Sequence, residues 1–241
     1  MLDNARTGTQ DGKKLNRLLT EIYRKLFARY GCQHWWPGET PFEVMVGAIL
    51  TQSCSWINVE KAIASLKEAG LMSPEALRNA TPEKLAALIH PSGYYNVKAK
   101  KIKALVEWLG ADCRDDISSL SKVGTGELRR ELLAVYGIGE ETVDSILLYA
   151  CGRPVFVVDA YTRRILTRLG FANGLKSYGE FQAFFMDNLP HDAALFNEYH
   201  ALFVRLGKEV CKKTASCGGC CLGDICPEAK KQSERLSCRR P

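Results

Sequence analysis

The chain contains 241 residues, of which 33 are lysine or arginine and 27 are aspartate or glutamate, so its formal net charge is +6 at pH 7. This length allows one large domain or two small ones, and the modest positive charge is compatible with a polyanionic partner without requiring one. No apolar run is as long as a bilayer-spanning helix, and the N-terminus lacks the hydrophobic core of a signal peptide. We therefore expect a soluble, cytoplasmic protein with no membrane partner.

Nearly every segment has apolar residues at helical spacing, and the alternation typical of strands is absent. In chain order, the segments with helical spacing are 15–27, 42–50, 98–109, 128–135, 143–147, 165–169, 181–189 and 193–206. Ser73-Pro74 and Thr81-Pro82 are typical of a capping residue followed by a first-turn proline, which predicts two further short helices. The polar tail after Pro227 is expected to fray. The sequence thus predicts an all-α protein.

A glycine-containing turn, Gly137-Ile138-Gly139, joins the helices predicted at 128–135 and 143–147, and Thr125 is the expected cap of the first. Glycine at 137 and 139 permits backbone angles that other residues resist, and it leaves peptide N–H groups exposed at the start of the second helix. Such donors, together with the helix dipole, bind a phosphate without reading a base. An ordinary interhelical turn is the alternative interpretation.

A loop containing Arg153-Pro154-Val155 follows, and then Asp159. In this order the hairpin, loop and aspartate resemble the signature of the endonuclease III superfamily of DNA glycosylases, and the resemblance covers about Phe42 to Cys226. It implies a two-lobed helix-hairpin-helix fold, with a six-helix barrel domain at 41–152 and a helical iron–sulfur domain formed by 1–40 and 153–241. It also implies a monomeric, nucleoid-associated base excision repair enzyme whose partner is double-stranded DNA containing damaged bases.

Four of the ten cysteines, Cys211, Cys217, Cys220 and Cys226, lie close together near the C-terminus. Thiolates at such spacing suit either zinc or an iron–sulfur cluster. The resemblance implies a 4Fe-4S cluster in a C-terminal loop, with a first interval one residue shorter than is usual in endonuclease III and with Cys221 as an alternative ligand. We expect the cluster to hold Lys212 and Lys213 against DNA; redox signalling is the alternative role.

The resemblance makes Asp159 the catalytic residue. Cleavage of an N-glycosidic bond builds positive charge on the sugar, which a nearby carboxylate stabilises while it orients a water molecule. Aspartate is also a favoured helix cap, so Asp159 is expected to begin the helix that follows, and both roles are compatible.

Bifunctional members of the superfamily have a lysine four residues after the first hairpin glycine, where this chain has Glu141. A carboxylate cannot form a Schiff base, so AP lyase activity is expected to be weak or absent. Glu141 itself is either a residue of the catalytic pocket or a first-turn acid that favours the helix dipole.

Aromatic residues suggest the substrate. Trp35, Trp36 and Phe42 resemble the segment of the 3-methyladenine DNA glycosylase III branch in which aromatic side chains receive the flipped base. Alkylation at purine N3 or N7 leaves the base positively charged, and a cation gains from stacking on indole faces. The alternative is that the tryptophans only close the core between the lobes.

The resemblance also covers two side chains that, in the superfamily, fill the gap left by the extruded base. Gln52 matches the glutamine that enters the gap, and Tyr94 matches the second wedge, although it is alternatively a packed turn residue. Lys98 in the following helix is expected either to contact a phosphate or to be solvated.

The sequence therefore predicts a monofunctional glycosylase for alkylated purines such as 3-methyladenine or 7-methylguanine. A glycosylase, with or without lyase activity, for oxidised, deaminated or mismatched bases is the enzymatic alternative. A non-catalytic binder of damaged DNA is the alternative of another class.

Overall fold

The computed structural model describes residues 4–237, which form helices and connecting loops and no strand. This confirms the predicted all-α class. The chain folds as two compact units, one formed by Trp36–Arg153 and the other by the residues up to Trp35 and from Pro154 onward. Among the described residues, no helix is both long and apolar enough to cross a membrane.

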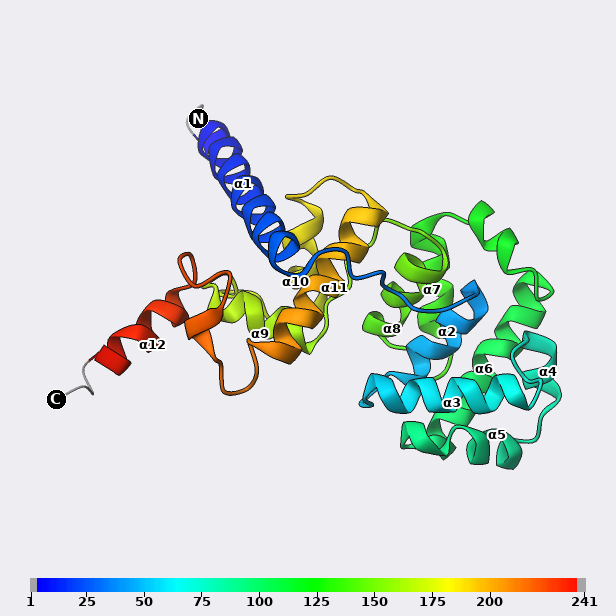
Figure 1. Cartoon of the computed structure of the whole chain (residues 1–241). Coiled ribbons are helices and arrows are strands. Elements are labelled where there is room, and N and C mark those ends of the chain that lie inside the picture. The colour runs from blue at the N-terminus through cyan, green and yellow to red at the C-terminus, as the bar shows by residue number, and fades with distance from the viewer. Residues whose placement is uncertain (1–3, 238–241) are drawn as a thin grey trace. The chain divides into compact units, whose positions relative to one another are not determined.

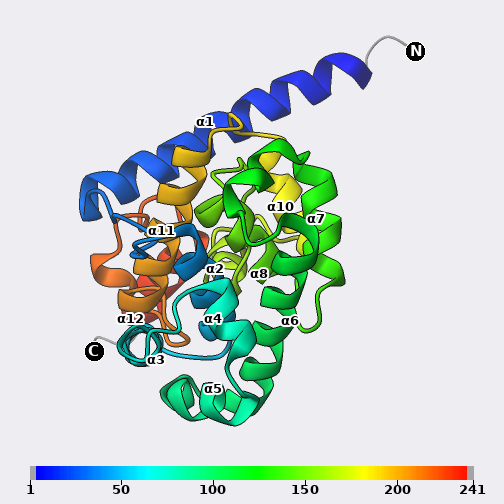
Figure 2. The same cartoon turned by 90° about the vertical axis from the view of Figure 1, so that its right-hand side faces the viewer.

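The unit from Trp36 to Arg153 is a bundle of short helices. Its elements are α2 (Pro41–Leu50), α3 (Trp56–Glu68), α4 (Pro74–Asn79), α5 (Pro82–Leu88), η1 (His90–Ser92), α6 (Tyr95–Cys113), η2 (Ile117–Lys122), α7 (Thr125–Ala134), α8 (Glu140–Ser145) and the π-helical η3 (Ile146–Ala150). Helix α2 is buried from Phe42 to Leu50. Helix α6 packs against α4 and α5 (Figures 1 and 2).

Local capping explains where several of these helices begin. The hydroxyl of Ser73 accepts a hydrogen bond from the amide of Ala76, and that of Thr81 accepts one from Lys84, which confirms both predicted caps. The predicted cap at Thr125 is wrong, because α7 begins at Thr125 itself and the cap position falls on Gly124. The sequence pattern also gave no prediction of α3.

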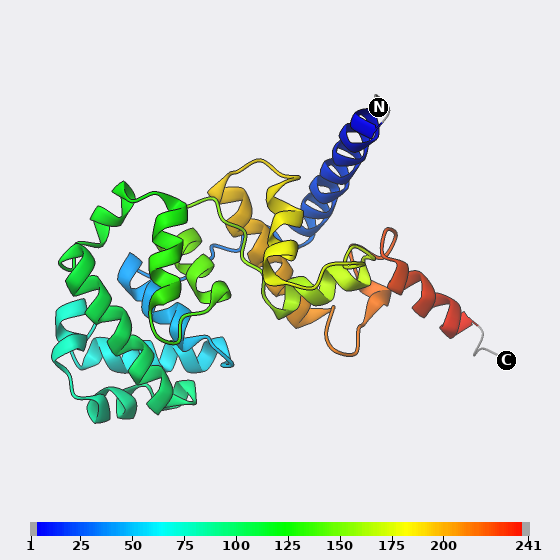
Figure 3. The same cartoon turned by 180° about the vertical axis from the view of Figure 1, so that it is seen from behind.

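The other unit contains α1 (Asn4–Tyr30), α9 (Ala160–Arg168), α10 (Tyr178–Met186), α11 (Ala193–Glu209), η4 (Cys217–Gly219) and α12 (Pro227–Ser237). Helix α11 packs against α1 and α9 (Figure 3). The core is rich in aromatic rings, and those of Phe156 and Phe185 stack with their centroids 3.8 Å apart.

The segment after Pro227 does not fray as predicted, because it forms α12 as far as Ser237. Proline suits the first turn of a helix. A long-range contact then holds the helix: the Gln232 side-chain amide donates to the Ala215 carbonyl and accepts from the Cys217 amide, at 3.0 Å each. The polar composition of the tail gave no indication of this contact of Gln232.

Candidate functional site

Asp159 begins α9 and caps it. Its Oδ1 accepts a hydrogen bond of 2.7 Å from the amide of Thr162, which confirms the predicted cap. The preceding residues, Val155 to Val158, are buried and fix the backbone that leads to this carboxylate. The Asp159 side chain keeps 12% of its surface exposed. The carboxylate is therefore held rigidly and still reaches the surface of its unit.

His200 of α11 lies beside this carboxylate, and sequence reasoning missed it. Its Nε2 is 3.7 Å from Oδ2 of Asp159, and the imidazole is buried. Burial lowers the pKa of His200 below its ordinary value of 6.5, while the charge of Asp159 acts in the opposite direction. The sequence around His200 does not indicate its contact with Asp159, because two residues so far apart in the chain meet only in the folded unit.

The hairpin between α7 and α8 uses its two glycines differently. Gly137 has a φ of +76°, and a Cβ atom there would lie 2.6 Å from Cγ of Lys101. Gly139 has a φ of −96°, which any residue adopts, and a Cβ atom there would meet no atom within 4 Å. The prediction that both glycines serve unusual backbone angles is therefore wrong for Gly139. The Ile138 side chain is buried, so only its backbone can face a ligand.

An ion pair with one buried partner joins the two helices of the hairpin. Arg129 of α7 donates to the carboxylate of Asp144 in α8 through Nε at 2.8 Å and Nη2 at 3.1 Å. Asp144 is fully buried. Loss of Arg129 would leave the buried charge of Asp144 without this partner, so the contact favours the observed packing of the two helices. An acidic residue within the apolar pattern at 143–147 was the available signal.

Glu141 lies in the first turn of α8, and its side chain is exposed. Its backbone carbonyl accepts a hydrogen bond of 2.7 Å from the Ser145 hydroxyl. An acidic side chain at this end of a helix is favoured by the helix dipole.

Gln52 is bound to the hairpin by its side chain. Its Nε2 donates to Oγ1 of Thr142 in α8 at 2.9 Å, and its Oε1 accepts from Nζ of Lys101. Tyr94, by contrast, is 74% exposed and caps α6 with a left-handed φ of 46°. It is therefore not the packed turn residue of the alternative interpretation.

Lys98 lies in the interior and is only 2% exposed. Its ammonium donates to the carbonyl oxygens of Leu50, at 2.8 Å, and Ser92, at 2.7 Å. Burial lowers its pKa. Neither the predicted phosphate contact nor a solvated lysine fits this geometry, because the two carbonyls satisfy the ammonium inside the unit.

The two adjacent tryptophans fall in different units. Trp36 packs edge-on against Trp56 and at a tilt against Tyr149, with ring centroids 5.3 Å apart in both pairs. Trp35 lies in the other unit, where Nζ of Lys208 is 5.9 Å from its ring. Trp56 and Tyr149 were not predicted, because nothing in the sequence indicates that their rings contact that of Trp36.

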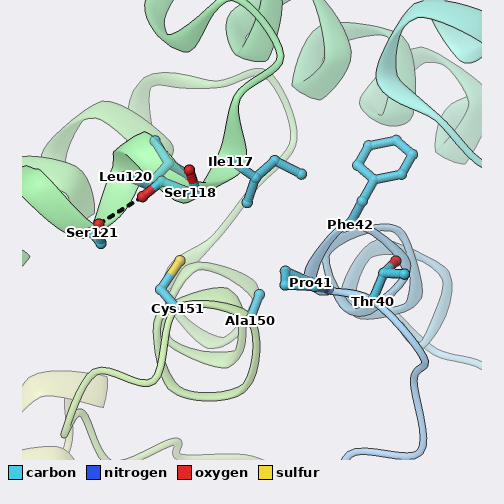
Figure 4. Close-up of a pocket in the computed structure, with 9 residues that line it drawn as sticks. All are labelled: Thr40, Pro41, Phe42, Ile117, Ser118, Leu120, Ser121, Ala150 and Cys151. Carbon is cyan, nitrogen blue, oxygen red and sulfur yellow. Dashed lines mark hydrogen bonds between the residues drawn. The ribbon is translucent and has the colours of Figure 1, made fainter.

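Phe42 lines an apolar cavity of about 380 Å³. Figure 4 shows Phe42 and Pro41 at the start of α2, Ile117 of η2, and Cys151 just after η3 around this space. Burial raises the pKa of the Cys151 thiol to about 11, so this thiol stays protonated at neutral pH. The cavity thus presents a largely apolar surface in which Phe42 is one wall.

The cysteine segment follows α11. Burial raises the pKa of the Cys217 thiol, and the thiols of Cys226, Cys220 and Cys211 are near enough to Cys217 to raise its pKa further. The side chain of Cys221 is hydrogen-bonded to that of Cys220. Among residues 4–237, no group of three or more histidine, cysteine, aspartate or glutamate side chains is arranged so that it could bind a single metal ion. A 4Fe-4S cluster needs wider spacing, because each thiolate binds a different iron atom.

Two arginines of α9 hold this segment. Arg164 Nε donates to the Cys211 carbonyl at 2.8 Å, and Arg168 donates to the carbonyls of Lys212 and Lys213 at 2.6 and 2.7 Å. Arg168 also donates to Sγ of Cys211 at 3.0 Å, a contact that suits a thiolate. The side chains of Lys212 and Lys213 are exposed. Helix α9, which Asp159 caps, thus fixes the backbone of Lys212 and Lys213 and leaves their side chains exposed.

Comparison with known proteins identifies the family. Residues 46–191 match the HhH-GPD superfamily of base excision DNA repair proteins. A provisionally named DNA repair glycosylase of Methanocaldococcus jannaschii is 44% identical over 211 residues, covering 87% of this chain and 96% of that protein. Endonuclease III of Thermotoga maritima is 30% identical over 215 residues, covering 87% of this chain and 92% of its own.

A solved structure shares the fold. The 3-methyladenine DNA glycosylase of H. pylori, bound to 1,N6-ethenoadenine, has a TM-score of 0.69 and 28% sequence identity, covering 82% of this chain and 97% of its own. The chain belongs to the HhH-GPD superfamily of base excision DNA repair proteins. Membership in this superfamily of DNA glycosylases makes it a base excision repair enzyme.

Proposed function

We propose that this enzyme extrudes an alkylated purine, such as 3-methyladenine or 7-methylguanine, from double-stranded DNA and hydrolyses its N-glycosidic bond. The observation that carries the substrate class is the aromatic cluster of Trp36, Trp56 and Tyr149. A cationic base gains more than a neutral one from contact with such rings. The 28% identity to a 3-methyladenine DNA glycosylase supports the same class. We also propose Phe42, which lines an apolar cavity of the same unit, and Trp35 as residues that contact the base.

In the proposed reaction, Asp159 is the catalytic residue. As the bond between C1′ and the base nitrogen breaks, the base takes the electron pair and the sugar becomes positively charged. The Asp159 carboxylate stabilises that charge and orients a water molecule, whose oxygen bonds to C1′ and whose proton is released. An N3- or N7-alkylated purine already carries a positive charge, so it leaves as a neutral molecule without being protonated.

We also propose that the enzyme lacks efficient AP lyase activity. The residue at the position of the lyase lysine is Glu141, whose exposed carboxylate cannot form a Schiff base with the abasic sugar. The proposed product is therefore an abasic site in an unbroken strand.

The proposed DNA contacts come from the hairpin Gly137-Ile138-Gly139, from Gln52 and Tyr94, and from Lys212 and Lys213. Their support is the glycine-containing turn, the exposed tyrosine and the two exposed lysines. We further propose a monomer that acts in the cytoplasm on nucleoid DNA, with a barrel domain at 41–152 and an iron–sulfur domain formed by 1–40 and 153–241.

We propose that Cys211, Cys217, Cys220 and Cys226 hold a 4Fe-4S cluster. The three thiols near Cys217 and the Arg168 contact to Cys211 support this proposal, because they fit thiolate ligands. When bound, the cluster would link these four cysteines and so hold the segment in one conformation. The chain's own residues then present Lys212 and Lys213 to DNA, because their carbonyls are fixed by Arg168.

The test is incubation of the purified protein with genomic DNA methylated by a simple alkylating agent. Mass spectrometry identifies the released bases, and a gel assay detects strand scission. We expect 3-methyladenine or 7-methylguanine to be released without scission, and much slower release by Asp159→Asn. Absence of methylated bases would contradict the proposed substrate, and scission without added base would contradict the proposal for Glu141.

A second candidate substrate class is oxidised, deaminated or mismatched bases, favoured by the 30% identity to endonuclease III. Duplexes containing thymine glycol, uracil opposite guanine, or thymine opposite guanine test it beside 3-methyladenine. Faster excision of one of these bases would replace the first proposal.

A further inference from the structure

Two loops of the unit from Trp36 to Arg153 carry Gln52 and Tyr94, and both contain strained backbone. Ser53, next to Gln52, has a φ of 52°, and Tyr94 has a φ of 46°. Residues with side chains adopt such left-handed angles only where surrounding contacts hold them. Something in the fold must therefore fix both loops.

The ammonium of Lys98 binds both loops at once. It donates to the carbonyl of Leu50, two residues before Gln52, and to that of Ser92, two residues before Tyr94. A single buried nitrogen thus links the backbones from which the two side chains extend. Because a lysine bound on two sides cannot move toward one loop without leaving the other, it sets their separation.

Lys101, one turn further along α6, fixes the Gln52 side chain. Its aliphatic chain lies against Gly137 of the hairpin, and its ammonium donates to Oε1 of Gln52, while the amide of Gln52 donates to Thr142. The loop that contains Gln52 is therefore tied to the hairpin as well as to the loop of Tyr94.

Burying a lysine ammonium is costly, and a methionine would fill similar space without desolvating a charge. Burial lowers the pKa of Lys98, and Lys101 acts in the same direction while Cys54 opposes it. We therefore attribute the role of Lys98 to geometry, because its ammonium fixes the separation between the carbonyls of Leu50 and Ser92.

We propose that Lys98 is a positioning residue that holds Gln52 and Tyr94 at a fixed separation, so that both enter the duplex together when a base is extruded. This inference rests on the proposed function, in which these two side chains fill the gap. Extruding a base costs free energy because the base must leave the stack. Two side chains already held at the right separation can offset this cost without the further entropic cost of ordering two loops.

The test uses a duplex in which 2-aminopurine stands opposite a tetrahydrofuran abasic analogue, so it does not depend on which damaged base the enzyme removes. Side chains entering the duplex disturb the stacking of 2-aminopurine and raise its fluorescence. We expect Lys98→Met to slow this rise by roughly 10- to 100-fold, as for a displaced contact group, and Lys98→Arg to restore part of the rate.

Lys103→Met is the matched control. Lys103 is also in α6, and its ammonium donates to the carbonyls of Ala80, at 3.1 Å, and Leu77, at 3.3 Å, at the end of α4. It makes the same kind of contact without touching either loop. We expect Lys103→Met to keep the parental rate of fluorescence rise, whatever its effect on thermal stability.

A parental rate in folded Lys98→Met, or an equal loss in Lys103→Met, would overturn the proposal. In a background of Gln52→Ala and Tyr94→Ala, adding Lys98→Met should cause no further loss, and a further loss of similar size would also overturn it. A parent that raises fluorescence but releases no methylated purine would contradict only the proposed substrate. A parent that gives no rise would overturn the insertion of both side chains and this inference with it.

Discussion

Asp159 combines a helix cap with the proposed catalytic carboxylate, and two substitutions separate these roles. Asparagine caps helices as well as aspartate does, so Asp159→Asn should keep its stability while single-turnover excision falls by roughly 10²- to 10³-fold. Asp159→Ala should lose the same activity and, in addition, about 1 kcal/mol of unfolding free energy. Urea unfolding and single-turnover assays measure the two effects. An active Asp159→Asn enzyme would contradict the catalytic role.

His200 predicts how stability depends on pH. Its pKa in the folded protein is lowered by burial, so the unfolded chain binds a proton first as the pH falls below 6.5. Stability from the neutral imidazole is therefore present above 6.5 and is lost progressively as the pH falls toward the folded pKa. We expect His200→Gln to show a shallower loss of unfolding free energy over this acidic range. Parallel curves for the two proteins would contradict the assignment.

At the scale of elements, the hairpin depends on one glycine for its shape. Gly137→Ala should lower the unfolding free energy by about 1–2 kcal/mol for the left-handed residue, and further because the new methyl group displaces Lys101. Gly139→Ala is the matched control, since its φ is ordinary and its surroundings are open. Chemical denaturation should leave Gly139→Ala close to the parent. Equal losses in both variants would show that backbone strain does not distinguish them.

The cysteine segment is an element whose order should depend on its proposed cluster. Cys217→Ala should lose iron and visible absorbance and, with them, much of the affinity for duplex DNA. Cys32→Ala changes an exposed cysteine outside the segment and should retain both. Iron analysis and DNA titration are the measurements. A colourless Cys217→Ala protein that binds DNA like the parent would separate the cluster from DNA binding.

At the scale of the whole molecule, the net charge of +6 predicts DNA affinity that falls with salt. If Lys212 and Lys213 each contact a phosphate, replacing both with alanine should reduce the slope of log affinity against log salt by about 2. Changing Lys230 and Lys231 removes the same charge from exposed positions of α12 and is the matched control. Equal slopes in the two variants would show that only net charge matters.

The sequence by itself determined the features that depend on neighbouring residues. Ser73, Thr81 and Asp159 cap helices because a side chain needs to reach only two or three residues along the chain. The helical class follows from apolar spacing, and the left-handed turn at Gly137 follows from the same local logic. Even here, the cap at Gly124 and the ordinary φ of Gly139 escaped prediction, because boundaries shift by one residue without changing the pattern.

Only the tertiary structure decided which polar groups meet across distant parts of the chain. Lys98 was predicted at a phosphate or in solvent, yet it binds the carbonyl of Leu50, 48 residues away. The pairing of Asp144 with Arg129 and the approach of His200 to Asp159 likewise join separate helices. The spacing of apolar residues predicts whether a residue faces the core or the solvent, but it does not predict which group that residue contacts. Those contacts arise when packed helices bring a buried charge to the groups that compensate its lost hydration.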